Sequence, residues 1–247
     1  MKTIISIDDT DNEHSPGSGQ LADDLAQELI LHRLVNEASD ISRHQLFIHD
    51  LVPYTSHNSA MCFTVCTDPN NYSDLIAFCQ DFLSLRSAQG SDPGLCVTDE
   101  HNVLGSQLLI DFGLRAKRSV MTKQAAYQTA EQAGIHLSEH GGTGDGVIGA
   151  LAGVGLRLSG CDGRIRGWHK TGEAGRTITI EKLCAVLRVP WAVDDNRTRL
   201  PGYARVSISD ERIKTVLHDH CAVVPLTRTD QMAVDWATLS PAESKRF

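Results

Sequence analysis

The stretch Thr3-Ile-Ile-Ser-Ile-Asp-Asp-Thr-Asp11 decides the fold class, because it leads an apolar β-rich run directly into a group of carboxylates. Residues 3–7 predict a short strand, and residues 8–19 predict a polar loop. Apolar residues then recur at helical spacing between Leu21 and Leu34. The chain is therefore expected to begin with a strand, an acidic loop and a long amphipathic helix.

The same periodicities extend this pattern along the rest of the chain. Strands are predicted at residues 45–52, 61–66, 95–97, 164–168, 177–180, 203–208 and 221–226, and helices from residue 73, at 104–117, at 123–133 and from residue 147. Such alternation favours a mixed α/β sheet. Pro190 marks the expected boundary between a larger α/β region, residues 1–189, and a small β-rich module, residues 190–247.

Composition narrows the classes of function. The 247 residues carry a net charge of −8, with 31 acidic and 23 basic side chains, and aromatic residues make up 5%. This balance argues against tight, non-specific nucleic-acid binding by the chain itself. The seven cysteines form no Cys-x-x-Cys pair, and no stretch has the length of a membrane span. We therefore expect a cytoplasmic protein with free thiols and no contact with a membrane, and we leave a homo-oligomer open.

The acidic loop is the first candidate site. Asp8, Asp9 and Asp11 follow the apolar strand at once, with Thr10 between them. Clustered carboxylates repel one another unless a cation neutralises them, and Mg²⁺ prefers oxygen ligands, with phosphates completing its shell. If the strand continued, Asp9 and Asp11 would point to one side and Asp8 to the other. The alternative is a solvated acidic turn that caps the following helix.

The second candidate site is the glycine-rich segment from Gly141 to Gly155, which includes Gly144, Asp145, Gly146 and Gly149. Glycines let backbone amides approach a phosphate, and a helix that starts there adds uncommitted N–H groups and a positive dipole end. The segment lacks the Gly-Lys-Ser/Thr of a Walker A loop. The alternative is a turn followed by a helix whose small residues pack closely against another backbone.

Histidines are the weakest signal. His57 lies in the polar loop Pro53-Tyr-Thr-Ser-His-Asn-Ser59, and His136 and His140 precede the glycine-rich segment. A lone histidine in such a place is more often a surface hydrogen-bonding group than a catalyst. No Ser–His–Asp or Cys–His set can be assembled from the sequence.

Four pieces, taken in order, resemble the N-terminal half of the archaeal agmatinylcytidine (agmatidine) synthases, which modify an isoleucine tRNA. They are Ile7-Asp-Asp-Thr-Asp11, Pro53-Tyr54 with Asn58, Asp92-Pro-Gly94 with Val97-Thr-Asp-Glu100, and Gly144-Asp-Gly-Val-Ile-Gly-Ala-Leu-Ala-Gly-Val-Gly155. The resemblance covers roughly residues 1–170. It implies a kinase-like α/β domain beside a ferredoxin-like α+β domain, with ATP and Mg²⁺ as cofactors. By position, Asp8, Asp9 and Asp11 would hold metal and phosphates, while Gly144, Gly146 and Gly149 would shape the nucleotide loop.

Three departures from the family pattern change the expectation. The family's Cys-Thr-Thr, whose threonine can take a phosphoryl group, is replaced by Gly17-Ser-Gly-Gln-Leu-Ala22, which leaves Ser18 or Ser15 as substitutes. The family's Gly-Arg-Gly reads Gly144-Asp145-Gly146. The family's oligonucleotide-binding fold and zinc ribbon have no counterpart in these residues. Thr10, Ser18 and Asp145 complete the expected nucleotide-binding set.

We therefore expect a Mg-ATP-binding protein, an ATP-dependent ligase or kinase-like enzyme that activates a small-molecule or RNA acceptor. The alternative is a nucleotide-binding sensor or subunit without chemistry of its own. In either case we do not expect the chain to bind nucleic acid directly without a partner. The acceptor, and the choice between phosphoryl and adenylyl transfer, are left open by the sequence.

Overall fold

The computed structural model describes residues 1–52, 58–101, 105–230 and 234–247. The chain divides into two compact units, residues 1–159 and residues 160–247. The division falls before the boundary expected at Pro190, because helix α6 (Ile180–Leu187) shares a hydrophobic core with strands that follow it in sequence, including Val206 and Leu226. The expected class, a mixed α/β protein, is confirmed.

The first unit is built on an antiparallel sheet. Its elements are β1 (Lys2–Asp8), α1 (Ser18–Leu31), β2 (Ser42–Gln45), β3 (Ser59–Cys66), η1 (Pro69–Asn71), α2 (Tyr72–Arg86), β4 (Gly94–Asp99), α3 (Ser106–Ala116), α4 (Lys123–Ala133), β5 (His136–Glu139) and α5 (Gly146–Leu158). The strand order is β5-β4-β1-β3-β2. β1 therefore pairs on both sides, with Ile7 opposite Met61 of β3 and Leu95 of β4.

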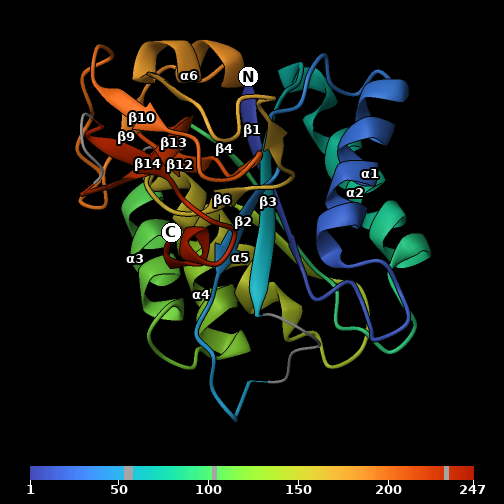
Figure 1. Ribbon diagram of the computed structural model, residues 1–247. Coiled ribbons are helices and arrows are strands. Elements are labelled where there is room, and N and C mark those ends of the chain that lie inside the picture. The colour runs from blue at the N-terminus through green and yellow to red at the C-terminus, as the bar shows by residue number, and fades with distance from the viewer. Residues whose placement is uncertain (53–57, 102–104, 231–233) are drawn as a thin grey trace. The chain divides into compact units, whose positions relative to one another are not determined.

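Side chains that alternate along β1 pack into two different hydrophobic cores. Ile5 and Ile7 pack with α1 and α2 on one face of the sheet, whereas Ile4 packs with α3, α4 and α5 on the other. The two helical layers lie on opposite sides of β1 and β3 (Figure 1). β1 is buried on both faces, and it delivers Asp8 to its carboxyl end on the side of α5.

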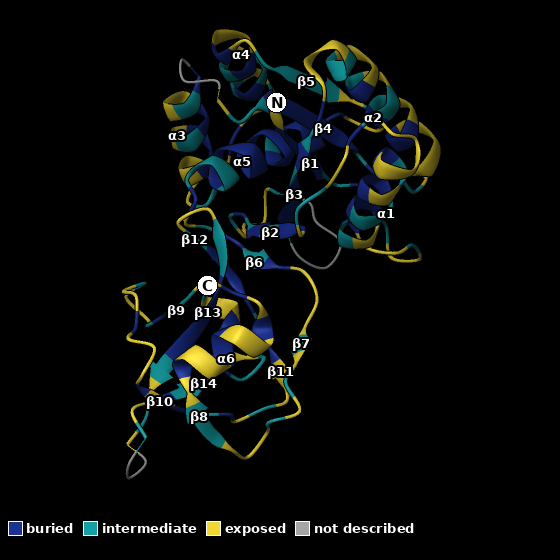
Figure 2. Ribbon diagram, turned by 90° about the horizontal axis from the view of Figure 1, so that it is seen from above, coloured by how far each residue is buried: buried dark blue, intermediate teal, exposed yellow. Residues whose placement is uncertain are grey.

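Helix α5 is the buried helix of this unit, as its glycine and alanine content predicts. Ten of its residues are buried (Figure 2). A Cβ on Gly155 would lie 1.8 Å from the carbonyl oxygen of Leu109 in α3, and a Cβ on Gly153 would lie 2.3 Å from the Oγ of Ser6 in β1. The small residues thus let α5 fit between α3 and the sheet, which confirms the close packing expected from the sequence.

The expected strand at residues 45–52 is wrong in its bounds. The ladder between β2 and β3 ends where Gln45 pairs with Ser59. Beyond that point the chain leaves the sheet, and the amide of Phe47 donates to the carbonyl of Ala116 instead. Leu46 is buried, but Ile48 and Leu51 are exposed, so the later part of the apolar run that suggested a strand does not enter the core.

The second unit consists of short strands and one longer one. Its elements are β6 (Arg164–Ile165), β7 (His169–Lys170), β8 (Thr177–Thr179), α6 (Ile180–Leu187), β9 (Ala192–Val193), β10 (Arg205–Ser207), β11 (Arg212–Ile213), β12 (Val216–His218), β13 (Cys221–Arg228), β14 (Trp236–Thr238) and η2 (Glu243–Arg246). The strands β6-β12-β13-β14-β10-β8 are neighbours in that order, β9 pairs with β13, and β7 pairs with β11. The strand expected to reach Ile180 stops at Thr179, whose hydroxyl accepts from the amide of Lys182 and caps α6.

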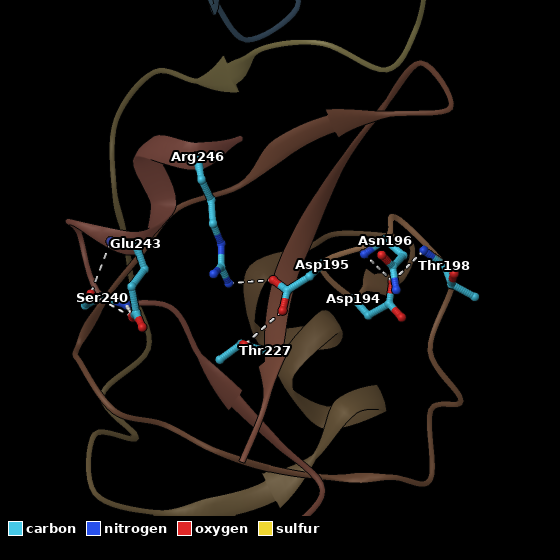
Figure 3. A network of polar contacts seen from close by, with 8 residues as sticks. All are labelled: Asp194, Asp195, Asn196, Thr198, Thr227, Ser240, Glu243 and Arg246. Carbon is cyan, nitrogen blue, oxygen red and sulfur yellow. Dashed lines mark hydrogen bonds and ion pairs between the residues drawn. The ribbon is translucent and has the colours of Figure 1, made fainter.

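A polar network ties the end of the chain to the strands of this unit (Figure 3). The carboxylate of Asp195 accepts from Arg246 and from the hydroxyl of Thr227 at 3.0 Å. Glu243 accepts from Ser240, whose hydroxyl lies 2.7 Å from Glu243 Oε2. The network therefore joins η2, β13 and the turn after β9.

The structure bears on the state of the cysteines and on the presence of membrane-spanning helices. All seven cysteines are free thiols. In the described part of the chain, no helix combines the length and the apolar character that crossing a bilayer requires.

Candidate functional site

Asp8 is the last residue of β1, and its side chain meets the start of α5. β1 and β4 place Asp8 opposite Gly94. A Cβ on Gly149 would lie 1.6 Å from the Oδ2 of Asp8. The glycine therefore makes the space that the carboxylate occupies, which brings together two residues that were predicted separately and lie far apart in sequence.

The loop after Asp8 leaves the strand direction at once. Asp9 has a φ of +50°, in the left-handed region that Asp and Asn tolerate better than most residues. The two-sided arrangement expected for a continuing strand is therefore not formed. Ser18, the first residue of α1, closes the loop: its Oγ accepts from the hydroxyl of Thr10 at 2.9 Å and donates to Asp11 Oδ1 at 2.6 Å.

The environment of Asp8 and Asp9 favours the neutral form of their carboxyl groups. Burial, followed by the charge of Asp9, raises the pKa of Asp8 to about 8. Burial, followed by the charges of Asp92, Asp11 and Asp145, raises the pKa of Asp9 to about 6. Three carboxylates from three separate segments thus raise the pKa of Asp9, and a bound cation would oppose that rise.

Asp92 is a site residue that sequence reasoning did not identify. In the sequence it appears only as the first residue of the stretch Asp92-Pro-Gly94, which carries part of the resemblance. Its carboxylate accepts from the amide of Thr143, and from the hydroxyl of Thr143 at 2.8 Å. The available signal was a carboxylate just before a strand that pairs with β1, but the pairing itself cannot be read from the sequence.

The glycine-rich loop takes a conformation that only glycine adopts easily. Gly142 and Gly144 have φ values of +55° and +80°. A Cβ on Gly142 would lie 1.5 Å from Asp92 Oδ1, and a Cβ on Gly144 would lie 1.4 Å from Glu139 Oε2. The loop is therefore pressed against two carboxylates before α5 begins at Gly146. The first turn of α5 contains no acidic residue, and Asp145 makes no side-chain cap, so no carboxylate of α5 competes with an anion at this helix N-terminus.

Lys123 supplies a cation to this loop. Its Nζ donates to the carbonyl oxygen of Thr143 at 2.6 Å and to Glu139 Oε2 at 2.9 Å. The sequence placed Lys123 only at the start of a helix. The structure shows that a basic side chain reaches the loop from α4, although Asp145 stands where the resembled family has arginine.

We expect Lys123→Met to loosen the glycine-rich loop without unfolding the protein. Lys123 and Glu139 are partly exposed, so the pair contributes little to global stability. The hydrogen bond to the loop carbonyl disappears, however, and amide exchange at residues 141–146 should become roughly 5–10-fold faster, because the local protection given by that hydrogen bond is lost. Hydrogen exchange measured by mass spectrometry checks this, with Lys123→Arg retaining most of the protection. Equal exchange in all three proteins would contradict the role given to Lys123.

A cavity of about 110 Å³ opens beside the acidic residues. One part of its wall is polar and another is apolar. The wall is formed by Asp8, Asp9, Leu46, Phe47, Leu51, Val52, Asn58, Ala116, Ser119, Val120, Met121, Asp145, Gly146, Ile148 and Gly149. Asn58, quoted in the resemblance, fixes this wall by donating to the carbonyl of Phe47 at 2.7 Å. The other residues of that polar loop, including Pro53, Tyr54 and His57, lie outside the described residues.

The donor set suits Mg²⁺ better than a metal held by protein alone. Among the described residues, no group of three or more His, Cys, Asp or Glu side chains is arranged to hold a metal ion. Mg²⁺ is commonly held by one or two carboxylates, with phosphates and waters completing its shell. Asp8 and Asp9, whose raised pKa values reflect burial and uncompensated repulsion, fit that pattern.

Several solved structures resemble the fold of this chain. The chain superposes on a complex of TiaS with an isoleucine tRNA and ATP with a TM-score of 0.54, at 24% identity over 63% of this chain and 36% of that one. A tRNA fluorescent labeling enzyme gives 0.54, at 22% identity over 74% and 42%. A complex of TiaS with the tRNA, AMPCPP and agmatine also gives 0.54, at 18% identity over 96% and 60%. The chain has the fold of one part of TiaS.

This likeness confirms the family resemblance seen in the sequence at the level of the fold. TiaS is the agmatidine synthetase of an isoleucine tRNA. The chain spans between 36% and 60% of the length of the structures just named, so it corresponds to only part of a TiaS chain. No protein-family model and no curated protein sequence matches it.

Proposed function

We propose that the first unit binds ATP with Mg²⁺ and that the protein is an ATP-dependent ligase or kinase-like transferase. The observation that carries this proposal is the meeting of Asp8 and Asp9 with the N-terminus of α5 around one cavity. A helix N-terminus and glycine amides favour phosphate, and paired carboxylates favour the cation that accompanies it. Solved structures of the same fold, by their names, contain ATP or AMPCPP.

The residues of the chain then take separate roles. Asp8 and Asp9 would hold Mg²⁺, which would neutralise phosphate charge when bound. The amides at Gly146 and the space at Gly149 would let the phosphates approach α5, while Asp92 fixes the glycine-rich loop through Thr143. The apolar wall around Phe47 and Ile148 offers a surface for the rest of the ligand. The acceptor would be a small molecule or an RNA.

A nucleotide-binding subunit without chemistry of its own is the second candidate function. It is favoured by Ser18, which stands in place of the phosphoryl-accepting threonine of the resembled family. Ser18 is 6% exposed, and its hydroxyl is held between Thr10 and Asp11. A hydroxyl held in this way serves the loop rather than an incoming phosphate. Incubation with labelled ATP distinguishes the candidates, because transfer of label to the chain or to an added acceptor requires chemistry.

We expect Asp9→Asn to abolish Mg²⁺-dependent nucleotide binding while the fold is retained. Asparagine tolerates the positive φ of this position, so the loop can keep its conformation. At a hundred times its dissociation constant, Mg-ATP should stabilise the wild type by about 2.7 kcal/mol, a rise in Tm of about 5–10 °C. The variant should show no such rise in a thermal unfolding experiment.

Asp81→Asn is the matched control, because Asp81 is an exposed carboxylate on α2, which lies on the other face of the sheet. It should respond to Mg-ATP as the wild type does. If Asp9→Asn showed the full Mg²⁺-dependent rise in Tm, the acidic loop would not belong to the nucleotide site. The absence of any rise in the wild type would mean that Mg-ATP is not the ligand.

A further inference from the structure

The edge strand β5 and the residue after it direct three polar side chains toward α2. His136, Ser138 and His140 alternate with residues such as Leu137, which packs into the core formed with α3, α4 and α5. The three polar side chains therefore lie on the opposite face, where Ser84 of α2 reaches His140.

The hydrogen bonds among these side chains run in one direction. Ser84 donates its only hydroxyl hydrogen to the carbonyl of Gln80 at 2.9 Å, so its Oγ accepts from His140 Nδ1, 3.3 Å away. The Nε2 of neutral His140 then carries no hydrogen, and it accepts from the hydroxyl of Ser138 at 2.8 Å. The Oγ of Ser138 in turn accepts from the Nε2–H of His136 at 2.9 Å. This serine–histidine ladder of two hydroxyls and two imidazoles fixes one tautomer for each ring.

The ladder ends next to the glycine-rich loop. The amide of His140 donates to the carbonyl of Pro93 at 2.8 Å, and Gly141 follows directly. A Cβ on Gly141 would lie 3.2 Å from the Cδ of Pro93, so the first glycine of the loop lies against the same residue. The side chain of His140 therefore anchors the point from which the loop begins.

We propose that the serine–histidine ladder positions the glycine-rich loop, residues 141–146, and that protonation of His140 at Nε2 releases it. A protonated Nε2 cannot accept the hydroxyl hydrogen of Ser138, for which the described residues offer no other acceptor. Protonation of His136 adds a hydrogen at Nδ1 and leaves its Nε2–H in place, so His140 is the sensitive member. The phosphate-binding role of the loop rests on the proposed function, whereas the ladder and its release do not.

The histidines are neutral at pH 7, which keeps the ladder intact. Burial lowers the pKa of both rings, and the charge of His140 lowers that of His136 further. Because the pKa of His140 in the folded chain lies below its ordinary value of 6.5, the stabilisation given by the ladder is present above about pH 6.5 and is lost as the pH falls below it.

The other ionisable groups near the ladder are held apart from it or stay neutral. Glu139 points to the opposite face of β5, toward Lys123 of α4, and Asp92 bonds the glycine-rich loop itself. Burial raises the pKa of Tyr72 on α2 to about 12, so this hydroxyl stays neutral. His140 is therefore the group through which pH acts on the ladder.

Nitrogen-15 NMR of the imidazoles in the full chain tests the ladder directly. At about pH 7.5 we expect His140 to carry its hydrogen on Nδ1 and His136 to carry its hydrogen on Nε2. Ser84→Ala removes the acceptor of the Nδ1 hydrogen, so the single tautomer of His140 should be lost. A wild-type His140 with its hydrogen on Nε2 would contradict the proposal.

Hydrogen exchange of residues 141–146, corrected for intrinsic rates, tests the effect on the loop. At about pH 7.5, exchange should be roughly threefold or more faster in Ser138→Ala and in His140→Gln than in the wild type. Ser138→Thr keeps the hydroxyl and should retain the protection, and His101→Gln, which removes an exposed histidine, should leave it unchanged. At about pH 5.5 the wild type should exchange as fast as Ser138→Ala.

Two results of the exchange experiment would overturn the proposal. Ser138→Ala could protect the loop as well as the wild type does, or the protection in the wild type could stay constant as the pH falls. Thermal unfolding at neutral pH shows whether each variant is folded. Titration with Mg-ATP is a separate measurement: its failure in the wild type would refute the proposed function, and the exchange experiment, which needs no nucleotide, would still decide the role of the ladder.

Discussion

Gly94→Ala is expected to destabilise the protein by about 3 kcal/mol or more and to lower its Tm by about 6–12 °C. A Cβ on Gly94 would lie 2.2 Å from the carbonyl carbon and oxygen of Gly146 and 2.4 Å from the amide nitrogen of Val147. These are backbone atoms at the start of a buried helix, so the contact can be relieved only by moving α5 away from β4. Urea unfolding of the variant and the wild type measures the difference in the free energy of unfolding.

Gly17→Ala is the matched control for this experiment. A Cβ on Gly17 would approach only Asp11 Oδ2, at 3.9 Å, and the φ of Gly17 is −64°. At this N-cap position we expect a change within about 1 kcal/mol. If Gly94→Ala were as stable as Gly17→Ala, the close approach of β4 and α5 would be wrong, and so would the framework that holds Gly146 and Gly149 beside the acidic loop.

The parts of the fold that the sequence predicts well are those with a local physical cause. The apolar run before Asp8 and the caps of α4 are local signals: Thr122 accepts from the amide of Ala125, and Gly134 takes the left-handed conformation that ends the helix. The small residues of α5 also predict a close approach to another backbone, although they do not identify Leu109 as the partner. Periodicity, caps and size act within a few residues, so one sequence suffices to recognise them.

The parts that could not be predicted depend on pairing between distant segments. Asp92 reaches Thr143 because β4 and β5 pair with Gly94 opposite Glu139, and Lys123 reaches the same loop from α4. No local pattern states which strands become neighbours. Some strands of the second unit, including β6 and β9, have only two residues, so alternation within them carries almost no information.

Asp8→Asn is expected to have opposite effects on stability and on nucleotide binding. Without Mg²⁺, the variant should be more stable than the wild type at pH 8 by about 2–4 kcal/mol, because it removes a buried charge that neighbouring carboxylates oppose. With Mg-ATP, the wild type should be the more stable of the two proteins, because the amide side chain in the variant does not supply the anionic oxygen that the cation requires. A site selected for binding commonly carries such a cost in stability.

The sign of this stability difference follows from the titration of the Asp8 carboxyl group. The carboxyl of Asp8 has a pKa of about 8 in the folded chain, against an ordinary value of 3.8. Between these values the folded state retains a proton that the unfolded state releases, so the stability of the apo wild type should fall as pH rises through this window and level off above pH 8. Asp8→Asn removes the part of that slope that comes from Asp8, while the raised pKa of Asp9, about 6, leaves a smaller fall up to about pH 6. The two proteins should therefore unfold alike near pH 4 and diverge steadily toward pH 8, and urea titrations at several pH values measure the divergence.

Asp81→Asn separates this effect from a general change in net charge, because it removes the same charge from an exposed position on α2. Its stability should follow that of the wild type at every pH. Saturating Mg-ATP should abolish the falling slope in the wild type, since a bound cation stabilises the ionised carboxylates and makes binding stronger as protons leave. If the slope persisted with Mg-ATP bound, Asp8 would remain protonated in the complex. The carboxylates that Mg²⁺ requires would then have to come from Asp9 and its other neighbours.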